Sequence, residues 1–151
     1  MLELYTILLA VSPIVELRGA IPMAVGFFHF WWGKALLLSL IGNILPVFPL
    51  LWFWENLSQK ISEASPLMNR FFHWLFSRTR RKFQGKWKRW GKVALTLFVA
   101  LPLPFTGAWT GTIAAFLFGI ERREAFLLIS GGVLIAGIIV TILTLGGIKL
   151  F

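Results

Sequence analysis

Long apolar runs, interrupted by charge and proline, divide the chain into five segments. The first run, Leu4 to Trp32, is longer than the ~20 residues of one membrane crossing and shorter than the roughly 40 residues of two. Pro13 and Pro22 interrupt it, and each removes a backbone donor and disfavours a continuous helix. The pattern therefore predicts a re-entrant hairpin, with arms over Leu4 to Ser12 and Ala20 to Trp32 and a tip over Pro13 to Gly19.

The same pattern recurs later in the chain. Ala35 to Trp54 is an apolar, uncharged run of the length that one transmembrane helix needs. Val93 to Ile120 is a second long apolar run, broken by Pro102 and Pro104, and it predicts a second hairpin. Ala125 to Ile148 then predicts a second full transmembrane helix.

Between the two halves, Glu55 to Lys92 is polar and basic. Ser65 followed by Pro66 is typical of a helix start. Aromatic residues recur beyond it at helical spacing, which predicts an amphipathic helix in the headgroup plane, with Gly85 as a candidate point of division. We expect its cations to contact lipid headgroups; they are Arg78, Arg81, Lys82, Lys86 and Arg89.

The order hairpin, helix, basic loop, hairpin, helix indicates an internal repeat. An offset of 88 residues aligns Gly19 with Gly107, and an offset of 90 aligns Gly42 with Gly132. Each half crosses the membrane once in net, so the second half must be inverted, which is a transporter architecture. The predicted fold is all-α and membrane-integral in one domain, 1–151, with repeats at 1–54 and 93–151 joined by the basic amphipathic loop at 55–92.

Composition supports this class and excludes others. The chain is 58% hydrophobic, and ten of its fifteen basic residues lie between Glu55 and Lys92. Beside membrane spans, such a segment indicates a cytoplasmic loop on anionic headgroups, and not a nucleic-acid partner. Without cysteine or aspartate, thiolate metal sites and a Ser-His-Asp triad are excluded. We expect no enzyme activity, no cofactor and no metal.

Topology has two alternatives that charge distinguishes weakly. With two re-entrant hairpins, the basic loop and the turn from Glu121 to Glu124 share the cytoplasmic face. With four plain spans, Arg122 and Arg123 would lie outside. Because Lys and Arg favour the cytoplasmic side, the hairpin topology is slightly favoured.

The first hairpin tip carries the candidate chemistry. Glu16 and Arg18 are ionisable groups at bilayer depth, where charge costs several kcal/mol unless it is paired or hydrated, so such residues are functional candidates. Glu16 is the candidate proton site, and Arg18 is its partner or the anchor for an anionic group. The alternative is that the two side chains only pair with each other and hold the tip together. The other candidates for the substrate or proton site are Gly19, Pro22, Asn43, Pro102, Pro104, Thr106, Gly107, Trp109 and Thr110. Asn43 has the alternative role of an interhelical hydrogen bond.

Two motifs carry a family resemblance. They are Glu16-Leu-Arg-Gly-Ala-Ile-Pro22 and Pro102-Leu-Pro-Phe-Thr-Gly-Ala-Trp109-Thr-Gly111. Together they resemble the putative small multi-drug export protein family, which is distantly similar to DedA-type membrane proteins. That resemblance implies hairpins entering from opposite faces, and export or polyprenyl-phosphate or phospholipid translocation as the activity. DedA proteins carry arginines in the second hairpin, where this chain has Thr106 and Thr110.

The sequence therefore predicts a small transporter-like protein that moves a small or lipid-like substrate by proton-coupled or facilitated transport. The expected location is the prokaryotic cytoplasmic (inner) membrane. The rival is a non-transporting scaffold that binds anionic lipid through the basic helix. Four to six short segments are a thin wall around two tips, so we expect a homo-oligomer packed through small residues near Gly111 and Gly132.

Overall fold

The computed structural model describes residues 1–82 and 86–150, without the side chains of residues 79, 80, 82, 86, 87 and 150. The described residues form helices and turns, with no strand among them. The helices are α1 (Leu2–Val11), α2 (Glu16–Gly26), α3 (Trp32–Ile44), α4 (Val47–Ala64), α5 (Pro66–Lys82), α6 (Lys86–Ala100), α7 (Ala108–Leu117) and α8 (Arg122–Leu150). Gly85, the expected division in the basic segment, lies outside the described residues.

Two of these units are long and apolar enough to cross a membrane. Helices α3 and α4 together span Trp32–Ala64, 33 residues that include an 18-residue stretch with a mean hydropathy of 2.0. Helix α8 contributes Arg122–Lys149, 28 residues that include such a stretch with a value of 2.7. The expected helical class is therefore confirmed, and these two units have the length and composition of membrane spans.

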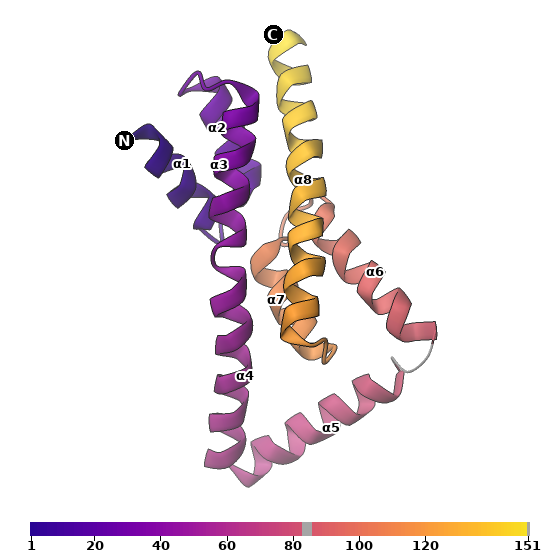
Figure 1. Ribbon diagram of the computed structural model, residues 1–151. Coiled ribbons are helices and arrows are strands. Elements are labelled where there is room, and N and C mark those ends of the chain that lie inside the picture. The colour runs from indigo at the N-terminus through magenta and orange to yellow at the C-terminus, as the bar shows by residue number, and fades with distance from the viewer. Residues whose placement is uncertain (83–85, 151) are drawn as a thin grey trace.

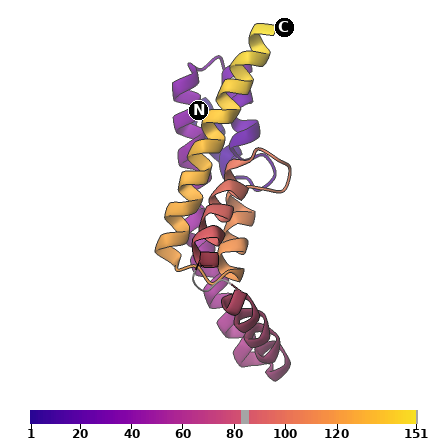
Figure 2. The same cartoon turned by 90° about the vertical axis from the view of Figure 1, so that its right-hand side faces the viewer.

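The two long units lie side by side, and two helix pairs pack around them (Figure 1). The α1–α2 pair lies beside α3, near the C-terminal end of α8, whereas the α6–α7 pair lies beside the N-terminal half of α8. The turn between α1 and α2 and the turn between α6 and α7 come together near the middle of the long helices in both views (Figures 1 and 2). This arrangement brings residues 12–16 and 101–109 into contact.

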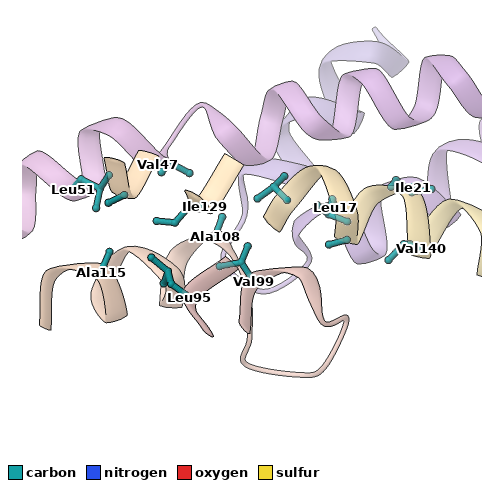
Figure 3. Packing of buried hydrophobic residues seen from close by; sticks show 13 residues of the cluster. Leu17, Ile21, Val47, Leu51, Leu95, Val99, Ala108, Ala115, Ile129 and Val140 are labelled. Atoms are coloured by element: carbon teal, nitrogen blue, oxygen red, sulfur yellow. The ribbon is translucent and has the colours of Figure 1, made fainter. Parts of the chain in front are cut away.

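The buried cluster draws on both pairs and both long units (Figure 3). Leu17 and Ile21 of α2 are almost fully buried, as are Leu95 and Val99 of α6 and Ile129 of α8. Because lipid is as apolar as these side chains, close van der Waals packing holds such helices together in a membrane. The cluster therefore depends on small residues that let backbones approach.

Two glycines mark the closest approaches. A Cβ at Gly42 would stand 2.6 Å from the Ile7 carbonyl oxygen, and one at Gly132 would stand 2.7 Å from the Thr96 carbonyl oxygen. Gly111 is likewise buried against Val99. Gly111 and Gly132 thus pack against helix α6 of the same chain. They do not form the free surface for a second copy that the sequence predicted.

Several predicted boundaries were wrong. The first transmembrane helix does not end at Trp54 but bends at Leu45 and Pro46 and continues to Ala64. The polar residues after Trp54 lie on the helix surface and do not stop it; the helix ends where Pro66 follows Ser65. At the other end of the basic segment, α6 begins at Lys86 and runs directly into the second apolar run.

Helix α5 begins at Pro66 as predicted. It contacts the second helix pair through Phe76, whose ring centroid lies 5.4 Å from that of Phe116. Its other face leaves Leu67, Phe71 and Trp74 exposed. The α5 helix is therefore attached along one side and open along the other.

Candidate functional site

Glu16 is the buried carboxylate at the turn of the first helix pair, with only 7% of its surface exposed. Its side chain lies directly over Gly107, where any Cβ would overlap the carboxylate. The backbone N–H groups of Ala108 and Trp109, in the first turn of α7, are its hydrogen-bond donors. A helix N-terminus stabilises negative charge through its free N–H groups and its dipole. The carboxylate of one helix pair therefore caps the helix of the other.

The backbone at Glu16 is itself in a rarely used conformation. Its φ is 50°, in the left-handed region, which costs a non-glycine residue roughly 1–2 kcal/mol. Such a conformation persists only where surrounding contacts hold it, and it is concentrated at functional sites. Here the contact with the start of α7 provides that constraint.

Arg18, two residues after Glu16 on α2, reaches the turn between α6 and α7 as well. Its guanidinium donates to the Leu101 carbonyl oxygen at 3.1 Å, to the Leu103 carbonyl oxygen, and to Thr106 Oγ1 at 3.0 Å. Among the described residues, Glu16 and Arg18 form no salt bridge with each other within 4.0 Å. The two charges interact at longer range. Each of the two side chains instead contacts the second turn, between α6 and α7. The first turn is therefore not held by a Glu16–Arg18 ion pair alone.

Trp109 and Thr110 complete the second turn. The Trp109 indole N–H donates to the Val11 carbonyl oxygen at 3.0 Å, which satisfies an open carbonyl near the end of α1. The Gly107 N–H donates to Thr110 Oγ1 at 3.0 Å, a local cap that fixes the start of α7. Trp109 therefore joins the two turns, whereas Thr110 shapes only its own.

A groove of about 490 Å³ begins at Arg18 and continues between α2, the second turn and α8. Pro22 and Pro102 line it, together with Val140, Leu143 and Thr144 of α8. Arg18 Nε is buried without a hydrogen-bond partner. The groove is thus shallow, open to the outside and largely apolar, with one cation at its end, and its volume is in the size range of small-molecule sites.

Three of the predicted site residues lie outside this contact. Gly19 packs against Val15 inside the first turn, and Pro104 is exposed. Asn43 lies on α3, where only 1% of its surface is exposed and its Oδ1 accepts no hydrogen bond. The interhelical hydrogen bond considered for that oxygen is not formed.

One cross-contact was missed by the sequence analysis. Trp54, the last residue of the first predicted transmembrane helix, is half-buried and its indole donates to Thr112 Oγ1 at 3.1 Å. Thr112 is fully buried and also donates to the Trp109 carbonyl oxygen at 2.6 Å. The position of Trp54 at the end of an apolar run gave no indication that its indole would form a hydrogen bond with α7.

The expected headgroup contacts lie away from the turns. Arg78 and Arg81 of α5 and Arg89 of α6 are exposed, and the Arg78 guanidinium stacks 5.2 Å from the Trp74 ring centroid. The side chains of Lys82 and Lys86 lie outside the described residues. No group of three or more His, Cys, Asp or Glu side chains suited to a metal occurs among the residues the structure describes.

Comparison with known proteins gives one match. Residues 16–139 match the family model described as putative small multi-drug export protein. No curated protein and no solved structure matches the chain. The match covers more than half of the sequence and includes Glu16, Arg18 and the turn between α6 and α7, so the chain belongs to the putative small multi-drug export protein family.

Proposed function

We propose that this protein is a small transporter whose site lies between the turns of two re-entrant hairpins. The observation that carries the proposal is the contact of the buried Glu16 carboxylate with Gly107 and the first turn of α7. A carboxylate shared between two structural halves at bilayer depth can link its protonation to their separation. The family to which the chain belongs is described as an export family.

Helix lengths support the re-entrant reading. Helices α1, α2 and α7 contain 10, 11 and 10 residues. At 1.5 Å per residue they are on the order of 15 Å long, about half of the ~30 Å hydrocarbon core. Non-helical turns at that depth need protein or water around them; Glu16 and Gly107 are buried where the two turns meet, whereas Ile14 and Phe105 remain exposed.

Matching contacts support an inverted repeat. Glu3 of α1 pairs with Lys34 at the start of α3 at 2.8 Å, and Lys92 of α6 pairs with Glu124 at the start of α8. The two salt bridges occupy equivalent places with the charges exchanged.

Two glycines also make equivalent contacts in the two halves. Gly42 of α3 rests on the Ile7 carbonyl and Ala10 of α1, and Gly132 of α8 rests on the Thr96 carbonyl and Val99 of α6. In both cases the contacts are a carbonyl and the side chain three residues later. Halves related in this way, with broken helices meeting between them, are the architecture of many secondary transporters.

The mechanism follows from the two charged contacts. Ionised Glu16 is attracted by the N–H groups at the start of α7, and protonation removes that attraction. The hairpins can then part, while Arg18 is released from the carbonyls of the second turn to hold an anionic or polar group of the substrate. A small or lipid-like substrate would occupy the adjoining groove.

A scaffold function is the second candidate, and the exposed face of α5 favours it. Leu67, Phe71 and Trp74 are exposed beside Arg78, as expected of a helix lying on anionic lipid. Under either function the basic segment faces the cytoplasm. A homo-oligomer would cover the exposed hydrophobic surface of the membrane helices.

Replacing Glu16 with glutamine tests the coupled mechanism, because the amide keeps the shape and cannot ionise. We expect at least a tenfold loss of pH-gradient-driven uptake of a fluorescent lipophilic cation or of a labelled phospholipid in proteoliposomes. Glu121→Gln, at an exposed turn, is the matched control and should transport normally. Uptake by Glu16→Gln equal to that of the native protein at every pH would exclude proton coupling through this residue. Loss of function only in Arg78→Glu/Arg81→Glu would indicate the scaffold instead.

A further inference from the structure

Three buried oxygen atoms have no hydrogen-bond partner among the described residues. They are Ser39 Oγ, Asn43 Oδ1 and Ser130 Oγ. Elsewhere in the membrane helices hydroxyls bond to the carbonyl four residues back, as Thr6, Thr141 and Thr144 do. An unsatisfied buried polar group is costly, so each such group requires an explanation.

The register of α3 and α4 against α8 allows the three residues to be placed in one region of the fold. Leu36 and Leu40 of α3 contact Gly137, and Phe48 pairs with Phe126 farther along, so the two units run antiparallel with a defined register. Midway between these contacts, Asn43 is level with Ser130.

Helical spacing places the same residues on facing sides. Asn43 follows Leu36 by seven residues and Leu40 by three, so it shares the stripe that contacts α8. Ser130 follows Phe126 by four residues and precedes Gly137 by seven, which places it on the stripe that contacts α3. Ser39 is one turn from Asn43.

The helix break adds further oxygens at this level. Pro46 and Pro49 have no N–H group, so the carbonyl oxygens of Gly42 and Leu45 lack their usual helical donors. The region thus combines hydroxyl, amide and carbonyl oxygens beside a broken helix. These oxygen atoms are ligands that suit a hard cation.

We propose that this region binds a monovalent cation of sodium size, held by Asn43 Oδ1 and the hydroxyls of Ser39 and Ser130, with carbonyl oxygens of the helix break. Broken membrane helices with exposed carbonyls coordinate Na⁺ in transporters. Asn43 is 1% exposed and Ser39 is fully buried, so the ion would be dehydrated and enclosed. The site is separate from Glu16 and does not require that the protein transports.

Thermal stability in detergent tests the site directly. At constant ionic strength, replacing choline with Na⁺ from 1 to 100 mM should raise the Tm of the purified protein by several degrees, because an ion that binds only the folded state stabilises it. The shift should be smaller with K⁺. Asn43→Asp adds a charged ligand and should move the Na⁺ dependence to at least tenfold lower concentration.

Removal of one ligand should have the opposite effect. Ser130→Ala and Ser39→Ala should each weaken the Na⁺ dependence at least tenfold, while Ser77→Ala on exposed α5 should leave it unchanged. A native Tm that does not respond to Na⁺ would show that the oxygens hold only water and would overturn the proposal. A Na⁺ response of unchanged midpoint in both Ser130→Ala and Ser39→Ala would overturn the assignment of the site.

Discussion

Replacing Gly132 with alanine is expected to cause one of the largest losses of stability among glycine-to-alanine changes in the described residues. The new Cβ would stand 2.7 Å from the Thr96 carbonyl oxygen and 2.7 Å from Val99 Cβ. A carbonyl on the neighbouring helix backbone cannot rotate away, so α8 must separate from α6. Overpacking of this kind costs about 1–3 kcal/mol, and we expect a clearly lowered Tm, measured by tryptophan fluorescence in detergent.

The adjacent residue supplies the control. Gly131 has open space around its Cβ position. Gly131→Ala should therefore show only the gain in helix propensity, up to ~1 kcal/mol, and a Tm equal to or above that of the native protein. Equal Tm values for the two alanine variants would refute the close α6–α8 contact.

Replacing Arg18 with alanine should be the most damaging change at the site. It removes the three hydrogen bonds that join α2 to the second turn, leaves the Leu101 and Leu103 carbonyl oxygens without this donor, and takes a cation away from Glu16. Hydrogen bonds to charged groups contribute about 1.5–3 kcal/mol each, and we expect a combined loss of about 3 kcal/mol. Chemical unfolding in detergent measures it.

Two further variants separate charge from geometry. Arg18→Lys keeps the charge but cannot present the planar fork, so it should recover only part of the lost stability. Arg123→Ala removes an exposed arginine and should change the unfolding free energy by less than about 0.5 kcal/mol. A similar small change for Arg18→Ala would show that its bonds to the second turn do not hold the two pairs together.

The sequence was sufficient for the family, the helical class and the membrane character. Charge inside an apolar run marked Glu16 and Arg18, because few side chains are so costly at that depth. Pro13, Pro102 and Pro104 marked the two turns, since each removes a backbone donor, whereas Pro22 was wrongly expected to interrupt the helix and lies inside α2. These signals reside in single residues, which is why they could be read without a structure.

The partners of these residues carried no comparable signal. Arg18 bonds to the backbone carbonyls of Leu101 and Leu103, and any residue would supply the same atoms. The Glu16 carboxylate fits over Gly107 because glycine has no side chain. The sequence could place Gly107 among the site candidates but could not identify Glu16 as its neighbour. The end of α4 was misplaced because a polar surface resembles a loop when the far side of a helix is unknown.

The measurement that tests the opposed hairpins most directly is cysteine labelling from each side of the membrane, since the natural chain contains no cysteine. Single cysteines replacing Leu2 and Lys149 should react with an impermeant reagent from outside. Cysteines replacing Arg81 and Arg123, which are both exposed, should react only from inside. Labelling of the Arg123→Cys variant from outside, with both termini labelled from inside, would establish four plain spans and contradict a site formed between two opposed turns.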